Sequence, residues 1–355
     1  MEEMAILYGV PKVAYGVDGC TPFPICVRSC AEYLGVRTSY TKIMAECGAA
    51  FRLVWDTSCW NGGNVDAVFT FDDPQKVFAC GMRSINRTFR MLPRTQRTTK
   101  EEFISFIRSE IDGGNPVIAL GIIGPPEACV ITGYRNQGNT LMGWNVFQEY
   151  PEHQSSVTFE TNGYFITDSW WENPDTCGLI ATGTGEAASF SLKEVLRNAS
   201  EVLEGRMDNT LAKGLTAYDA WRNALLRDRD FPEEPVFPIL VERMMCHGDA
   251  MDCLSDGRKH AAAYLRGQAA CYPQYREKLN AAANMFEAVS SILWNEMIPV
   301  LGGWERGEAQ MKKLFEKETR RTFAGMIDRM KRHEEWALVY IRDLIREMTL
   351  ENRLS

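Results

Sequence analysis

The chain lacks a surplus of basic residues, because its 355 residues carry 39 Lys and Arg against 47 Asp and Glu, a net charge of −8. A phosphate backbone gains little from such a surface, so nucleic acid is not an expected partner. No apolar stretch approaches the roughly 20 residues that span a bilayer, and the N-terminal Met-Glu-Glu-Met lacks the basic start of a signal peptide. We predict a cytoplasmic protein without a membrane partner.

The usual signs of metal and nucleotide binding are also missing. There are four histidines, and no two of the eleven cysteines have Cys-x-x-Cys spacing. Cys246, His247 and Cys253 are close in sequence, but a zinc site needs a fourth ligand, which is not evident. The loop Trp60-Asn-Gly-Gly-Asn-Val-Asp66 lacks the Lys-Ser/Thr ending of a phosphate-binding loop. We expect no metal and no cofactor, and mostly reduced, buried cysteines.

Composition changes near residue 185. Residues 1–184 hold 14 Lys/Arg and 20 Asp/Glu, whereas the shorter 185–355 holds 25 and 27. Glycine and proline are concentrated in the first part, and Thr182-Gly-Thr-Gly-Glu186 has the composition of a linker. We predict two domains, 1–184 and 185–355.

The first domain has the pattern of an α+β fold. A proline-led helix is predicted from Pro24 to Leu34, and Thr98-Thr-Lys-Glu-Glu102 has capping-box spacing before an amphipathic helix that ends at Gly113. Short runs rich in β-branched residues, each ended by Gly, Pro or Asn, predict consecutive strands. They lie at about 116–123, 128–134, 140–147, 163–168 and 178–182.

The second domain is predicted to be all-α, with five to seven helices, since apolar residues recur there at helical spacing. The heptad-like pattern over 318–350 suits either packing within the domain or pairing with a second chain, so a homodimer is one expectation.

Chemistry is expected around three side chains of the first domain. Cys20 lies just before the proline-led helix, where unsatisfied N–H groups and the helix dipole favour a thiolate. Glu127 opens the second predicted strand and Asn145 lies in the third, so both are expected to face a cysteine across the sheet. Cys26, within the helix, is the alternative nucleophile, although it is also read as a packing residue.

Further residues are candidates for binding. Trp60, Asn61 and Asn64 lie in the glycine-containing loop, and Trp144 and Gln148 flank Asn145. All five are predicted to contact substrate, with a structural turn and core packing as the competing interpretations. In the helical half, His247 and His260 are candidates to supply an imidazole, or else lie on a solvated helical face.

Residues 9–182 resemble the N-terminal domain of the butirosin biosynthesis protein H family, which is related to the bacteriocin-processing, double-glycine-leader cysteine peptidases. These families place a cysteine at the start of a helix ending in Tyr-Gly or Leu-Gly, as Cys20 to Gly35 does here. Their histidine opens a strand ending in Thr-Gly-Tyr, which corresponds to Glu127, and their Asp or Asn corresponds to Asn145. The family spacing to the terminal Gly is about two residues shorter, which keeps Cys26 as an alternative.

The resemblance implies a papain-like first domain that acts through a cysteine thioester. The expected function is acyl transfer or amide hydrolysis through Cys20, with Glu127 as base and Asn145 as orienting residue. The expected partners are a small molecule or peptide substrate and an acyl carrier protein. The alternative is an inactive relative that binds a peptide or small molecule, because Glu127 replaces the histidine. A DNA-reading regulator is disfavoured by the net charge of −2 of the helical half.

Overall fold

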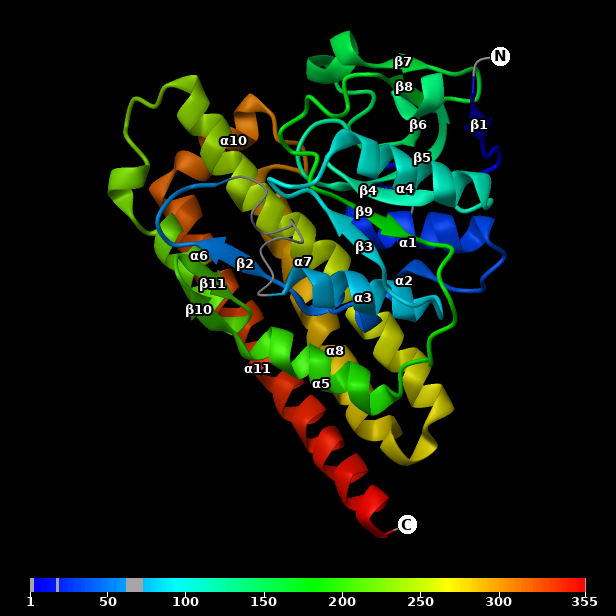
Figure 1. Cartoon of the computed structure of the whole chain (residues 1–355). Helices are drawn as coiled ribbons and strands as arrows, with labels where there is room; N and C mark the ends of the chain where they lie inside the picture. The colour runs from blue at the N-terminus through cyan, green and yellow to red at the C-terminus, as the bar shows by residue number, and fades with distance from the viewer. Residues whose placement is uncertain (1–2, 17–18, 62–72, 355) are drawn as a thin grey trace. The chain divides into compact units, whose positions relative to one another are not determined.

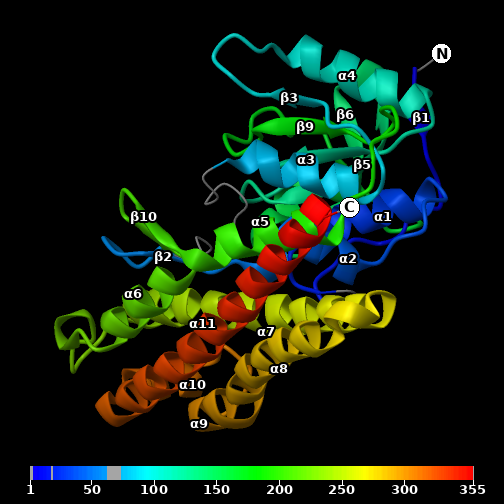
Figure 2. The same cartoon turned by 90° about the horizontal axis from the view of Figure 1, so that it is seen from below.

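The computed structural model describes residues 3–16, 19–61 and 73–354, and Figures 1 and 2 show it from two sides. The fold is mixed, with an antiparallel sheet and a C-terminal helical region. Contacts divide the chain into two compact units. Unit 1 comprises residues 1–43 and 75–189, and unit 2 comprises residues 44–74 and 190–355. Within the described ranges, no helix is long and apolar enough to cross a membrane.

Unit 1 is built on an eight-stranded sheet in which every pair is antiparallel. Its order is β3-β9-β4-β5-β6-β8-β7, and β1 pairs with the second half of β5. The five predicted strand regions are confirmed as β4, β5, β6, β8 and β9, and β5 is the longest. The strands are β1 (Ala5–Ile6), β3 (Met91–Pro93), β4 (Val117–Leu120), β5 (Ala128–Arg135), β6 (Thr140–Trp144), β7 (Thr158–Phe159), β8 (Phe165–Thr167) and β9 (Gly178–Ala181).

Helices cover this sheet. The predicted proline-led helix is α1 (Pro22–Tyr33), which contacts β4 and β5. The helix α4 (Lys100–Asp112) packs on alternate residues of β4, β5 and β9 and starts at the predicted capping box, formed by Thr99 and Glu102. The remaining helices are α3 (Pro74–Ser84) and α2 (Tyr40–Glu46), and α2 straddles the division between the units.

Unit 2 is predominantly helical, as predicted. The long helix α8 contacts both α7 and α11 (Figure 2). A π-helical turn at Leu293–Met297 joins α8 to α9. The α-helices are α5 (Leu192–Glu204), α6 (Leu215–Leu225), α7 (Phe237–Cys271), α8 (Arg276–Ile292), α9 (Ile298–Leu301), α10 (Glu308–Phe315) and α11 (Lys317–Leu354).

The structure corrects the prediction that the second domain is all-α. A small antiparallel sheet, in the order β10-β11-β2, joins β10 (Arg206–Asp208) and β11 (Leu211–Lys213) to β2 (Val54–Asp56). Trp55 of β2 stacks on Trp221 of α6 with 6.1 Å between ring centroids. Residues 44–61 therefore fold with the second half of the chain, and the later division falls after residue 189 where the sequence predicted 184.

A fully buried ion pair ties three segments of unit 2 together. The guanidinium of Arg258 on α7 donates from Nε and Nη2 to the Glu334 carboxylate on α11, with 3.0 Å between Nη2 and Oε2. Its Nη1 donates to the carbonyl oxygens of Arg52 (2.6 Å) and Ala50 (3.2 Å). The backbones approach closely here, since a Cβ on Gly257 would lie 2.9 Å from the Ala50 oxygen.

We predict that Glu334→Gln lowers the free energy of unfolding by about 3 kcal/mol, because it leaves the buried Arg258 charge without its counter-ion. Glu335→Gln is the matched control, since that neighbouring carboxylate is exposed and 3.8 Å from Lys331, and its cost should stay within about 0.5 kcal/mol. Urea unfolding followed by circular dichroism measures both. Equal losses in the two variants would contradict the role given to the buried pair.

Candidate active site

Cys20 is half-buried and lies two residues before α1. Thr21 is the N-cap residue of the helix, and its N–H donates to the Tyr40 hydroxyl (3.2 Å). Cys20 therefore precedes a helix, as the sequence predicted, and the dipole at the start of a helix favours a thiolate. Pro22 and Pro24 carry no N–H, however, so the first turn offers fewer backbone donors to an anion than an ordinary helix does.

Glu127 stands immediately before β5, at the end of a tightly held loop. The Gly121 N–H donates to the Glu127 carbonyl oxygen (3.0 Å), and the Glu127 N–H donates to the Pro125 oxygen (2.7 Å). Asn173 Nδ2 donates to the oxygens of Gly121 (2.7 Å) and Gly124 (2.9 Å). The loop 121–127 thus holds the backbone of Glu127 in a defined position at the head of the strand.

Asn145 follows β6 directly and is only 2% exposed. Its Oδ1 accepts from the Phe147 N–H (2.7 Å), and its Nδ2 donates to the Ile123 oxygen (3.3 Å). Both ends of the amide are therefore engaged inside the protein. The side chain connects the turn after β6 to the loop 121–127 that carries Glu127.

The start of β5, the end of β6 and α1 converge at one edge of the sheet. Because β5 and β6 are antiparallel and Val130 lies opposite Trp144, Glu127 and Asn145 belong to the same edge. The helix α1 contacts β5, and the negative charge of Glu127 contributes to the raised pKa of Cys26 on that helix. The structure thus places Glu127 and Asn145 at one edge of the sheet, and Cys20 two residues before the helix that contacts β5.

Cys26 has the properties of a packing residue. It is completely buried, and burial, with smaller contributions from Cys129, Cys30 and Glu127, raises its pKa well above the usual thiol value. Burial raises the pKa of Cys129 to about 12 in the same region. A thiol in this environment stays protonated at neutral pH, which agrees with the packing role that the sequence gave as the other interpretation of Cys26.

Trp144 and Gln148 are buried side chains that hydrogen-bond to the backbone around the site. The Trp144 Nε1–H donates to the Val10 oxygen (2.9 Å), and the ring packs edge-on against Tyr164. Gln148 donates from Nε2 to the Gly163 oxygen (3.0 Å) and accepts the Asn145 N–H (2.9 Å) through Oε1. Both side chains are under 10% exposed, so they position neighbouring backbone and present little surface to a substrate.

Trp60 and Asn61 of the predicted binding residues belong to unit 2. Trp60 packs edge-on against Trp55 and Phe231, and its Nε1–H donates to Asp230 Oδ2 (3.1 Å). Asn61 is exposed, and Asn64 lies outside the described residues. The predicted substrate set is thereby divided between the two units.

The two histidines proposed for the helical half are both mostly buried within unit 2. His247 accepts the Trp221 Nε1–H at Nδ1 (3.2 Å) and stacks on Phe323, with 5.1 Å between ring centroids. His260 Nε2 lies 3.3 Å from Asp256 Oδ1, the helical neighbour that the sequence spacing predicted. These contacts give both imidazoles structural roles inside the helical unit.

Sequence reasoning missed His153, which follows β6 in a short 3-10 helix, Pro151–Ser156. Its Nε2 lies 3.0 Å from the position that a Cβ on Gly124 would occupy, so the imidazole touches the loop that leads to Glu127. Its ring packs edge-on against Phe147, which packs in the same way against Tyr15, five residues before Cys20. The available signal was that His153 is the only histidine among residues 1–184.

A scan against models of known protein families and a search of curated proteins found no match to this chain. In the part of the chain that the structure describes, no three His, Cys, Asp or Glu side chains are grouped closely enough to hold a metal ion. The chemistry of the site is therefore argued from the side chains at the sheet edge alone.

We predict that His247 makes unit 2 sensitive to acid. Burial, assisted by the positive charge of Arg306, lowers the pKa of His247 to about 3. The unfolded chain takes up this proton below about pH 6.5, and the folded chain does not, so the free energy of unfolding should fall as pH drops. The slope contributed by this one group approaches about 1.4 kcal/mol per pH unit.

Urea unfolding of the wild type and of His247→Phe between pH 7 and pH 5 tests this expectation. Phenylalanine keeps an aromatic ring between Trp221 and Phe323 but binds no proton, so the variant should lose less stability over this range. Parallel pH dependences in the two proteins would show that His247 titrates normally in the folded state.

Proposed function

We propose that the chain is a cysteine-dependent acyltransferase or amide hydrolase of papain-like type that acts through a thioester on Cys20. The observation that carries this proposal is the sheet edge in unit 1. A cysteine precedes a helix that packs on an antiparallel sheet, at the edge where β5 opens with Glu127 and β6 ends before Asn145. The resemblance of residues 9–182 to the butirosin biosynthesis protein H family supports the same assignment.

The reaction has two balanced steps. The Cys20 thiolate attacks the carbonyl carbon of an amide or thioester, the bond to the leaving amine or thiol breaks, and that leaving group takes up a proton. An acceptor amine or water then attacks the Cys20 thioester, loses a proton, and releases the acyl product and the thiol. The substrate class is a small molecule or a peptide, and an acyl carrier protein is the proposed donor.

Glu127 suits the second step better than the first. A carboxylate near a thiol opposes thiolate formation by like-charge repulsion, whereas it can accept the proton of an incoming amine or water. The imidazole of His153, beside the same loop, is the candidate base for the Cys20 thiol. Asn145 would act by holding loop 121–127 through the Ile123 oxygen.

The alternative is a catalytically inactive relative that binds a peptide or small molecule. A specific observation favours it, because the Asn145 amide, which would orient an imidazole in an active triad, is already satisfied by Phe147 and Ile123. The same edge would then recognise a ligand without forming a covalent intermediate.

Cysteine alkylation separates the two functions. At pH 7, iodoacetamide should label Cys20 about tenfold faster than the exposed Cys271, because the start of a helix favours the reactive thiolate. Incubation with an acyl N-acetylcysteamine thioester should add the acyl mass to Cys20, as read by peptide mass spectrometry, and Cys20→Ala should abolish the adduct.

Variants of His153 and Glu127 test which residue acts as base in each of the two steps. His153→Gln should slow the labelling of Cys20, whereas Glu127→Gln should leave labelling intact or speed it and should slow transfer of the acyl group to an amine. If Cys20 reacts no faster than Cys271 and forms no acyl adduct, the enzymatic proposal fails and the binding alternative stands.

A further inference from the structure

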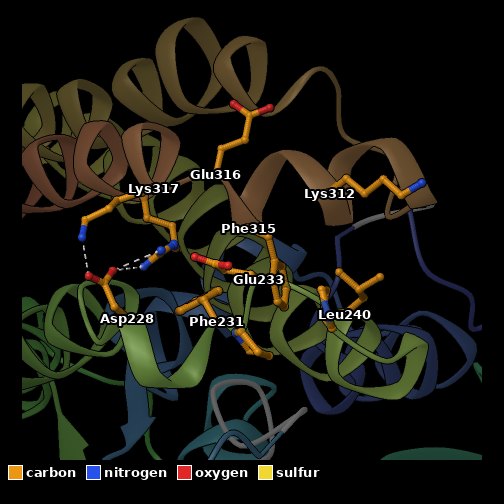
Figure 3. Close-up of a pocket in the computed structure, with 11 residues that line it drawn as sticks. Asp228, Phe231, Glu233, Leu240, Lys312, Phe315, Glu316 and Lys317 are labelled. Atoms are coloured by element: carbon orange, nitrogen blue, oxygen red, sulfur yellow. Dashed lines mark hydrogen bonds and ion pairs between the residues drawn. The ribbon is translucent and has the colours of Figure 1, made fainter.

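Unit 2 contains a hollow of about 730 Å³, well away in sequence from the residues of the candidate active site (Figure 3). It is lined by the connection after α6, by the first turns of α7 and by the junction of α10 and α11. Its volume falls within the range of about 300 to 1,000 Å³ that is typical of small-molecule sites.

The middle of the hollow is apolar and rigid. Phe231 and Phe315 pack edge-on, with 5.1 Å between ring centroids, and Phe231 and Leu240 are almost fully buried. Pro232 and Pro235 lie in the same lining and restrict its backbone. Figure 3 shows Phe231, Phe315 and Leu240 between Lys317 on one side and Lys312 on the other. An apolar side chain of a ligand would be desolvated against this floor.

One side of the hollow carries an excess of positive charge. Asp228 is a single carboxylate that accepts hydrogen bonds from two cations, Lys317 and Arg320. Arg320 is itself buried, donates to the Leu225 oxygen (2.8 Å), and lies over the Phe231 ring at 4.2 Å from its centroid. The cluster of Asp228, Lys317 and Arg320 therefore has one positive charge more than it has negative charges.

An opposite charge lines the same hollow. Lys312 pairs with Glu308, and Glu316 pairs with Lys313, so these two lining residues are compensated. Among the described residues, Glu233 has no ion-pair partner and is exposed. The hollow thus combines one uncompensated cation, one uncompensated carboxylate and an apolar floor.

We propose that this hollow binds a small zwitterion with an apolar side chain, an amino acid or a dipeptide. The ligand carboxylate would pair with Lys317 at the Asp228 cluster, the ammonium group would pair with Glu233, and the side chain would lie on Phe231 and Phe315. Such a ligand satisfies both charges at once, whereas a simple acid or amine would leave one of them unpaired.

Isothermal titration calorimetry on the full chain tests the proposal with L-phenylalanine and L-leucyl-L-phenylalanine as probes. Phenethylamine and 3-phenylpropionate are the matched compounds, since each keeps the ring and lacks one charge. At least one zwitterion should bind, and at least tenfold more tightly than both of these compounds. Failure of both zwitterions to bind, or equal binding of the singly charged compounds, would overturn the proposal.

Variants inside and outside the lining test whether the ligand binds in this hollow. Glu233→Gln and Lys317→Gln should each weaken binding about tenfold, as the loss of one charged hydrogen bond predicts. Glu234→Gln and Arg321→Gln change adjacent charges outside the lining and should leave affinity within about twofold, the effect typical of exposed charges. Equal losses in both pairs would show that general charge, and not this hollow, determines binding.

Discussion

The helical unit depends on the buried charge of Arg258. A guanidinium without access to water is tolerated only where it is paired and hydrogen-bonded, and here each of its three nitrogens donates to Glu334 from α11 or to a carbonyl oxygen at residue 50 or 52. The requirement fixes three parts of the chain that are separated by up to 284 positions along the sequence. It also explains why the segment around Ala50 and Arg52 folds with the second half, since these residues supply two of the acceptors.

The elements of the fold were largely predictable from local patterns. Runs rich in β-branched residues and ended by Gly, Pro or Asn predicted β4, β5, β6, β8 and β9. A proline-led start predicted α1, and a capping box predicted α4. The three-stranded sheet of unit 2 was not predictable, because β2, β10 and β11 have three residues each and too few positions for an alternating pattern. Their pairing depends on long-range contacts such as that between Trp55 and Trp221.

The candidate site was predictable in outline and not in detail. Placing Cys20 before a helix, Glu127 before a strand and Asn145 after the next strand follows from chain order and antiparallel pairing. The hydrogen bonds of the Asn145 amide with Phe147 and Ile123 could not be predicted in this way, because they depend on how two loops pack against each other. The same is true of His153, whose position beside Gly124 results from the fold of the segment after β6.

The charge balance at this edge bears on which acyl transfer the proposed enzyme would perform. A Cys20 thiolate paired with an imidazolium on His153 would be neutral overall, whereas Glu127 at the same edge would add a negative charge that opposes the thiolate. The prolines of α1 remove backbone donors that would otherwise soften this repulsion. A cationic acceptor amine would relieve it, because its ammonium group can pair with Glu127 and then give up its proton there. If Cys20 is catalytic, transfer of an acyl group to an amine therefore suits the site better than hydrolysis by neutral water.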